Sequence, residues 1–405
     1  MKAEYFKIVL ILITYMFLLS ACKSGSDDNI ENINNGILSL SIKLDVVIGE
    51  EDQPPEYLLG EPVGVRTDHE GNIYIADRAS LTVKVFDNDG TYLHSFGGRG
   101  RGPGEFQNIN LMEKTPEGNL FILDRGKLEY IYLSKQGNYL SSHRVDVSNQ
   151  TTQYYPHRVF WYEDKTIGIR RSGAIPSLGL PPFERPLFHI YSNDFQQHFE
   201  SFFPFYELGY SEYEHFIWNS FGWLPGSFDL SDNGIKLVYS PGVYNGVLYE
   251  FIRTGNSWVL NRKINAVKPS TEAYEIYTSN EQYERNSHLP GVNKIHYFGG
   301  PYIGRLYSVD AGIFYLENGN IAHFYGEWRG GDKTLEKGNT LDIIAQILDC
   351  EGEVKAQGHI ISIERDARPS LPLINWKDDE GKFYLIDSNK YGVPKVKKFK
   401  LVENK

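Results

Sequence analysis

The 405-residue sequence is poor in cysteine, in cationic relative to anionic residues, and in long stretches with a helical period. Two cysteines cannot form the multiple-disulfide framework that stabilises small secreted domains. With 41 Lys and Arg against 52 Asp and Glu, the formal net charge is −11, which argues against nucleic acid as a partner. Aromatic residues at 14% and 39 glycines favour strands joined by tight turns, and hence an all-β fold.

Residues 60–106 predict one complete four-stranded module. The expected strands are short and bounded by turn residues, and they cover 62–67, 72–76, 81–86 and 92–96. The link between the last two contains Asp89-Gly90, a pair that tolerates the positive φ of a hairpin turn. Four short antiparallel strands separated by tight turns are typical of one blade of a β-propeller.

The second strand of this module recurs along the chain. The segment GNIYIAD at 71–77 returns as GNLFILD at 118–124 and GKFYLID at 381–387, with weaker copies at 164–170, 233–239 and 312–316. The first interval is about 47 residues and later ones reach about 70, which we interpret as loop insertions in the same repeat. Six copies predict a six-bladed β-propeller over residues 37–405, a single domain in which each blade buries its faces against its neighbours.

Two segments depart from the repeat. The last blade supplies only three strands, and the apolar stretch at 37–48 is expected to complete it as the outermost strand. Such a closure joins the chain ends and removes the exposed edge of an open ring. Residues 270–285 predict one helix, capped by Ser270 or Thr271 and acidic in its first turn, which interrupts the repeat as an insertion.

The N-terminal residues predict targeting. Residues 1–21, expected to be a signal peptide, combine two lysines with an apolar run at 8–19 that is too short to span a bilayer comfortably. The run ends in Leu-Ser-Ala-Cys at 19–22, which resembles the lipobox of bacterial lipoproteins, where the cysteine is lipidated after cleavage. An ordinary signal peptide with a chance cysteine is the alternative. We expect Cys22 to anchor the chain to the membrane and residues 22–36 to form a flexible tether.

The acidic run Ser26-Asp27-Asp28 follows the expected anchor closely. It resembles the export signal that carries Bacteroidetes lipoproteins to the outside of the outer membrane, although a solvated linker would have the same composition. We therefore expect an outer membrane lipoprotein exposed on the cell surface, with a periplasm-facing orientation as the alternative.

The blade sequence carries a family resemblance. The pattern Asp-x-x-Gly-Asn-hydrophobic-Tyr-hydrophobic-x-Asp, followed by a Val-Phe-Asp strand and an Asp-Gly turn, resembles NHL-type (NHL/TolB-like) propellers. The glycine-rich link at 97–106 is similar to that of six-bladed propeller lipoproteins common in Bacteroidetes. This likeness covers residues 60–145 and 375–400, and it implies a fold and a cell address without a reaction.

Related propellers include lyases and lactonases that hold a metal in the central channel. Such sites need histidines, asparagines or carboxylates that converge from several inner strands. The expected inner strands at 63–67, 109–112 and 158–161 show no matching set, since Asn110 and His157 are isolated. No metal and no cofactor are predicted.

Six arginines are expected to gather on one face, over the first three blades, because they follow the repeated aspartates or lie on an inter-blade link. They are Arg78, Arg99, Arg101, Arg125, Arg170 and Arg171. Such a patch is able to hold an anionic group bidentately. The alternative is that they form structural ion pairs with Asp77, Asp124 and nearby carboxylates.

Residues 202–223 are the second candidate, because their aromatic density far exceeds the average. Aromatic faces flanked by carboxylates and amides suit a sugar ring or the apolar patch of a partner, and Tyr213, Trp218 and Trp223 are the candidate contacts. The alternative is that these rings fill the seam between the third and fourth blades.

Together these features predict an envelope lipoprotein whose propeller is a non-catalytic binding module, bound to the membrane through Cys22. The expected partner is an outer-membrane protein or an extracellular glycan or peptide. The alternative is a metal-dependent propeller enzyme of lyase or lactonase type, with its site in the central channel. The sequence contains no Gly-x-Ser-x-Gly elbow, and no two of its histidines have metal-ligand spacing.

Overall fold

The computed structural model describes residues 37–145, 156–170, 182–211, 214–221, 224–295, 301–329, 340–364, 373–387 and 393–404. The expected signal peptide, Cys22 anchor and tether lie outside the described residues, so they stay predictions. Among the helices in the described part of the chain, none combines the length and the apolar character needed to cross a membrane.

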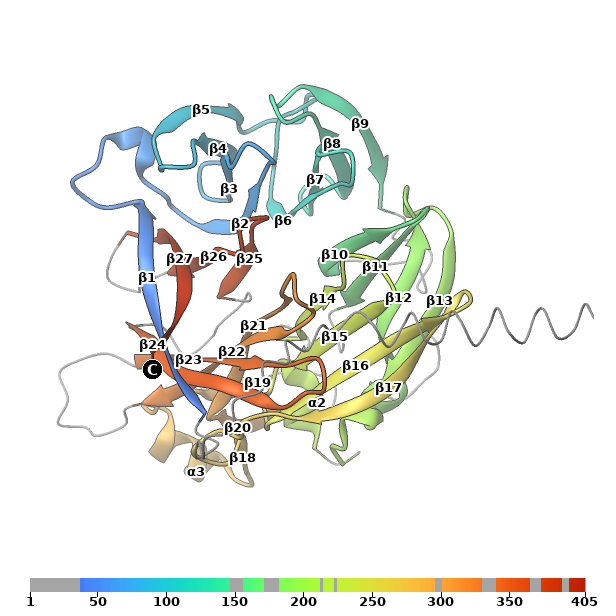
Figure 1. Cartoon of the computed structure of the whole chain (residues 1–405), viewed down its shortest axis with the longest axis vertical. Coiled ribbons are helices and arrows are strands. Elements are labelled where there is room, and N and C mark those ends of the chain that lie inside the picture. The colour runs from blue at the N-terminus through green and yellow to red at the C-terminus, as the bar shows by residue number, and fades with distance from the viewer. Residues whose placement is uncertain are drawn as a thin grey trace, which may run out of the picture.

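Strands dominate the molecule and form consecutive antiparallel sheets. In four of these sheets, each of four strands pairs with the next one along the chain. Figure 1 shows the sheets standing around a common centre, with the first strand of each nearest to it. The strands are β2 (Pro62–Thr67), β3 (Ile73–Asp77), β4 (Thr82–Phe86) and β5 (Tyr92–Gly97); β6 (Ile109–Lys114), β7 (Leu120–Asp124), β8 (Glu129–Leu133) and β9 (Tyr139–Arg144); β10 (Pro156–Tyr162), β11 (Lys165–Arg170), β12 (Pro186–Ser192) and β13 (His198–Pro204); β14 (Gly226–Leu230), β15 (Lys236–Pro241), β16 (Val247–Thr254) and β17 (Ser257–Asn265).

Two further blades belong to one eight-stranded sheet. Its fifth-blade strands are β21 (Ser308–Tyr315), β22 (Ile321–Arg329), β23 (Thr340–Leu348) and β24 (Val354–Glu364). Its sixth-blade strands are β25 (Ile374–Lys377), β26 (Phe383–Asp387), β27 (Lys395–Asn404) and β1 (Leu38–Ile48). The prediction of an all-β propeller is confirmed, and the described strands of the blades form six units of four.

Strand β1 lies between the fifth and sixth blades in the eight-stranded sheet. It pairs antiparallel with β27 along nearly its whole length, ending at Ile48 opposite Val396. At its beginning, Leu38 and Ser39 also pair in parallel with β24. The stretch predicted at 37–48 therefore lies beside the last strand, with β24 on its other side, and its role in closing the ring stays a prediction.

The insertion between the fourth and fifth blades is a small sheet, so the prediction of one helix over 270–285 was wrong. Strands β18 (Tyr274–Tyr277), β20 (Tyr302–Leu306) and β19 (Val292–Ile295) form the sheet, and α3 covers only Asn280–Asn286. Residues 274–277 pair with β20, a partner distant in sequence that outweighs the local helical preference. The helix is capped by Ser279, whose hydroxyl oxygen accepts a hydrogen bond from the Gln282 N–H at 3.1 Å.

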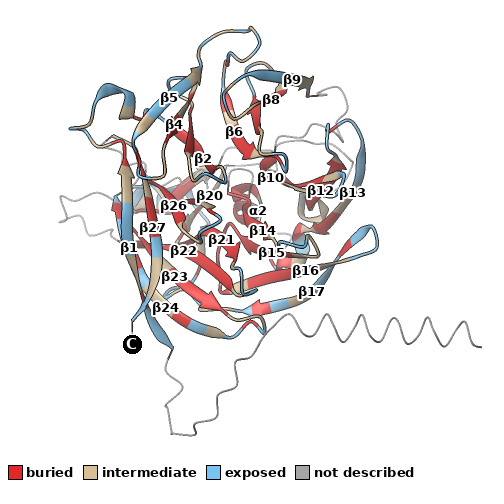
Figure 2. Ribbon diagram, turned by 45° about the horizontal axis from the view of Figure 1, so that its top comes forward, coloured by how far each residue is buried: buried red, intermediate tan, exposed pale blue. Residues whose placement is uncertain are grey.

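Apolar side chains pack in the seams between neighbouring blades. Ile48 of β1 shares one cluster with Val65 and Phe86 of the first blade and Tyr384 of the sixth. Figure 2 shows burial concentrated on the inner strands, whereas outer strands such as β5 and β9 carry exposed residues. Short helices lie in the links between strands: η1 (Pro55–Tyr57), η2 (Pro182–Glu184), η3 (Phe205–Leu208) and α2 (His215–Ser220).

Candidate functional site

In each of the first two blades, the repeated aspartate at the end of the second strand ties the blade to its own entry segment. The carboxylate of Asp77 accepts hydrogen bonds from the backbone N–H groups of Gly60 at 3.1 Å and Glu61 at 2.6 Å. Asp124 does the same in the second blade, accepting from the N–H groups preceding β6 at 2.7 and 3.0 Å. Both aspartates are buried, so the repeat reflects a structural bond and not a ligand site.

The arginines beside these aspartates have diverse surroundings. Arg78 donates from Nε to Glu61 Oε2 at 2.8 Å, and this hydrogen bond raises the pKa of Arg78. The ion-pair interpretation therefore holds for Arg78, although its partner is Glu61 and not Asp77. Arg99, Arg101 and Arg125 are exposed.

The last two candidate arginines are only partly covered by the structure. Arg170 ends β11 but its side chain is outside the described residues, as is the whole of Arg171. The proposed anion patch over the first three blades stays a prediction.

The aromatic stretch at 202–223 contributes mainly to the core. Phe203, Phe205, Phe216 and Phe221 belong to the largest apolar cluster, which matches the packing interpretation for these residues. The three candidate contacts are not placed. Tyr213 and Trp223 lie outside the described residues, and Trp218 lies on α2 with a side chain that is likewise not described.

A set of buried polar side chains lines the inner strands, one from each blade. We call it the inner-strand polar set; its members are Arg66 on β2, Glu113 on β6, Arg158 on β10, Asp229 on β14, Asp310 on β21 and Asn375 on β25. Positive and negative charges alternate from the first blade to the fourth. Because burial makes an unpaired charge costly, this arrangement constrains which inner strands can be neighbours.

Contacts across three blades centre on Arg66. Its Nε donates to Glu113 Oε2 at 2.7 Å, and its Nη1 donates to Asn375 Oδ1 at 2.8 Å. The side chains of Arg66 and Glu113 are only 2% and 3% exposed. Asn375 Oδ1 also accepts from the Val65 N–H at 2.8 Å, which fixes the amide orientation.

On the other side of the centre, Arg158 lies over the rings of Phe160 and Phe314, with its Cζ 4.8 and 5.4 Å from their centroids. Burial lowers the pKa of Arg158, and the nearby carboxylates, Glu113 foremost, oppose that effect. Burial raises the pKa of Asp229 to about 6, against the opposing influence of Arg158 and of a 2.8 Å hydrogen bond from the Tyr315 N–H.

Sequence reasoning missed this set because it searched the inner strands for metal ligands alone. Arg66 and Arg158 were inside the stretches considered, and Glu113 lies one residue beyond the second. The available signal was a charged residue inside an otherwise apolar strand at the same place in successive repeats. Among the described residues, no group of three or more His, Cys, Asp or Glu is arranged to hold a metal ion.

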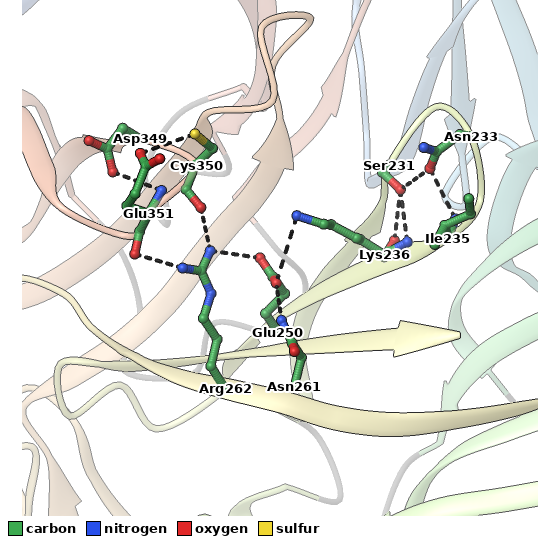
Figure 3. A network of polar contacts seen from close by, with 10 residues as sticks. All are labelled: Ser231, Asn233, Ile235, Lys236, Glu250, Asn261, Arg262, Asp349, Cys350 and Glu351. Atoms are coloured by element: carbon green, nitrogen blue, oxygen red, sulfur yellow. Dashed lines mark hydrogen bonds and ion pairs between the residues drawn. The ribbon is translucent and has the colours of Figure 1, made fainter. Parts of the chain in front are cut away.

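A second polar cluster joins the fourth and fifth blades at their outer strands (Figure 3). Arg262 Nη2 donates to the buried carboxylate of Glu250 at 2.9 Å and to the Cys350 carbonyl at 2.6 Å. Its Nη1 donates to the Glu351 carbonyl, also at 2.6 Å. One guanidinium thereby connects β17 to the turn after β23 through its two Nη atoms, whereas its buried Nε has no hydrogen-bond partner among the described residues.

An open cavity of about 530 Å³ lies between the fourth blade and the insertion. We call it the Tyr210 cavity; its lining consists of Leu208, Gly209, Tyr210, Asn245 and residues 268–274. Tyr210 is buried, stacks on Phe205 and donates from its hydroxyl to the Val243 carbonyl at 3.0 Å. The exposed rim offers the Thr271 hydroxyl and the Glu272 carboxylate. The cavity therefore combines an aromatic wall of fixed orientation with lining side chains of both positive and negative charge.

The comparisons with known proteins concern the fold. A family model described as a 6-bladed beta-propeller matches residues 54–173. A member of the DUF4221 family from Bacteroides vulgatus is 10% identical, with 91% of this chain and 100% of that one covered and a TM-score of 0.53. A protein from Bacteroides fragilis is 12% identical, with 90% and 96% covered and a TM-score of 0.50. No curated protein matches the sequence.

A streptogramin B lyase structure is 9% identical over 90% of this chain and all of that chain. Its TM-score of 0.43 is too low to support an inference about activity. The family model and these structures agree with the predicted β-propeller fold, whereas the NHL type and the lipid anchor stay predictions.

Proposed function

We propose that this protein is an envelope lipoprotein whose β-propeller acts as a non-catalytic binding module. The ligand is an outer-membrane protein or an extracellular glycan or peptide. Lipidation at Cys22 attaches the chain to the outer membrane, and the acidic tether behind it directs the propeller to the cell surface. Strand β1 then closes the ring directly after the tether.

The Tyr210 cavity is the observation that carries this proposal. At about 530 Å³ it falls within the size range of ligand pockets, which runs from roughly 300 to 1,000 Å³. Its wall is rigid, because Tyr210 is held by ring contacts and by the Val243 carbonyl. Its rim presents hydroxyl, amide, ammonium and carboxylate groups, from Thr271, Asn245, Lys268 and Glu272. Such a combination suits a polar ligand with both donors and acceptors.

The enzyme alternative makes a separate demand. A lyase or lactonase of the metal-dependent type needs an ion held by side chains that converge on the channel. Elemental analysis of the purified protein separates the two proposals, because stoichiometric calcium or zinc would favour the enzyme.

The binding proposal is tested by crosslinking in intact cells, purification through the propeller and mass spectrometry of what accompanies it. We expect one dominant ligand or outer-membrane partner. Replacing Thr271 by tryptophan fills the rim of the Tyr210 cavity and should remove that partner. The matched control is Thr254→Trp, at an exposed position of β16 away from the cavity, which should retain it. Recovery that is equal in both variants, or no partner above background, contradicts the proposal.

A further inference from the structure

Two cavities lie beside each other on the face of the propeller that carries the first turn of each blade. One, of about 310 Å³, lies between the second and third blades, and the other, of about 400 Å³, extends to the fourth. Trp161 of β10 lines both. The turn at 115–119 also contributes to both cavities. Pro116 lines the larger cavity, and Thr115, Glu117 and Asn119 line the smaller one. The two cavities share this wall and lie across three blades, and we call them together the Trp161 groove.

The topology explains why these residues meet. In a four-stranded meander the first and third turns lie at the same edge of the sheet, and the groove is built largely from such turns. They are 115–119 in the second blade, Glu163 and 193–194 in the third, and 231–234 in the fourth. The Tyr210 cavity is formed at the opposite edge, from the second turn of the fourth blade and the following link. The two sites are therefore separate.

Aromatic rings form the walls of the groove. Trp161 is half-buried and packs edge-on against Phe121, with centroids 5.4 Å apart, so its orientation is fixed while part of the ring remains accessible. Phe160 and Tyr162 line the larger cavity, and Tyr132 lines the smaller. Fixed aromatic faces offer contact area to the C–H face of a pyranose ring at little cost in conformational entropy.

The polar groups beside these rings are held by neighbours. Arg253 Nη2 donates to Glu163 Oε1 at 2.7 Å, which orients both side chains at the larger cavity. In the smaller cavity, the Asp194 carboxylate accepts from Ser192 Oγ at 2.6 Å. The Thr115 hydroxyl lines the same cavity and is buried without a hydrogen-bond partner. Planar carboxylates and a guanidinium are suited to the adjacent hydroxyl groups of a sugar.

The charges along the groove discriminate among sugars. The groove is lined by four carboxylates and one arginine. The carboxylates belong to Glu117, Asp194, Glu163 and Asp232, and the arginine is Arg253. An acidic sugar would meet like charges at several points, which disfavours it. A peptide would need backbone hydrogen-bond partners, whereas the polar groups described above belong to side chains.

We propose that the Trp161 groove binds a neutral oligosaccharide, with one sugar ring stacked on Trp161 and others in the two flanking cavities. This inference goes beyond the binding role proposed above, because it assigns a second site, separate from the Tyr210 cavity, and names its ligand class. The length of the groove, across three blades, suits a chain of several sugar units. The carboxylates accept hydrogen bonds from the ring hydroxyls, and Arg253 donates hydrogen bonds to them.

The test is isothermal titration of the full mature chain with hexasaccharides of glucose, xylose, mannose and galacturonic acid. We expect at least one neutral hexasaccharide to bind and the galacturonic acid chain not to bind. Trp161→Ala should weaken binding about 30-fold, the effect of losing a central aromatic contact. Because Trp161 also packs on Phe121, Asp232→Ala provides a second variant at an exposed position of the groove, and it should weaken binding several-fold.

The matched control is Phe199→Ala, which removes an aromatic ring that is 44% exposed on β13 and lines neither cavity. Its affinity should equal that of the unaltered chain. Neutral-sugar binding that survives both Trp161→Ala and Asp232→Ala overturns the inference, as does binding only to the acidic chain or to none. If crosslinking in intact cells still recovers a ligand in that case, the binding role itself stands and only the groove assignment fails.

Discussion

Replacing Arg66 by methionine tests whether the inner-strand polar set is a buried structural element. The substitution keeps an unbranched side chain but removes both the ion pair with Glu113 and the hydrogen bond to Asn375 Oδ1. Glu113 would then be a buried carboxylate that has lost its hydrogen-bonded counter-charge, with Arg158 as the remaining cation nearby, and its Oε1 already has no hydrogen-bond partner. Breaking a buried pair in this way costs about 3–5 kcal/mol of unfolding free energy.

The expected shift in melting temperature follows from the size of the propeller. An unfolding entropy of about 2.1 cal/mol/K per residue, over about 370 residues, gives roughly 0.8 kcal/mol/K, so Arg66→Met should lower Tm by about 4–6 °C. Calorimetry and urea denaturation measure this loss. The double variant Arg66→Met with Glu113→Met removes the stranded charge and should recover at least half of it, because buried ion pairs are often replaceable by apolar residues.

The matched control is Arg78→Met, which breaks an Arg–Glu pair whose side chains are 33% and 51% exposed. Because water and salt screen that pair, the loss should be about 1 kcal/mol or less. If Arg66→Met costs no more than Arg78→Met, or if the double variant is no more stable than Arg66→Met alone, the buried-pair reasoning is refuted.

Three further predictions follow from particular residues. Deleting residues 37–48 removes the strand beside β27 and the buried Ile48 side chain, so Tm should fall substantially. A melting curve measures the change, and unchanged cooperative melting would contradict the proposed closure of the ring. The pKa of Asp229 is raised from an ordinary 3.8 to about 6, so folding disfavours its charged form. The free energy of unfolding should therefore fall by about 3 kcal/mol as pH rises from about 4 to 6. Urea titrations at several pH values should show that this fall is absent in Asp229→Asn. If the predicted arginine patch binds an anion in competition with the Arg78–Glu61 ion pair, double replacement of Arg78 and Arg125 by methionine should abolish phosphate binding, measured by equilibrium dialysis, and binding that persists rejects the patch.

The fold could be predicted from the sequence because a propeller repeats its local signals. In each of the first two blades, the Gly-Asn-to-Asp segment specifies a turn, a buried strand and the aspartate that ties the blade to its entry segment. Those contacts lie within one blade, about 17 residues apart, so their pattern is visible in a single stretch of sequence.

The parts that failed depend on partners distant in the chain. Residues 274–277 adopt a strand because β20, almost 30 residues later, supplies their hydrogen bonds. Likewise, Arg66 is buried beside Asn375, a residue more than 300 positions away. The Trp161 groove brings together turns from three blades, and no single repeat contains its chemistry. Its aromatic residues are visible in the sequence, but the curvature that places them together is not.

The central claim, that the propeller works by binding, is tested most directly by a photoreactive amino acid placed at Thr271 in the full lipoprotein and activated in intact cells. The same amino acid at Thr254 serves as the control, since both threonines are exposed and only Thr271 lines the Tyr210 cavity. The account predicts one adduct of defined mass at position 271 and none above background at position 254. Equal labelling at the two positions, or no adduct at 271, would contradict it.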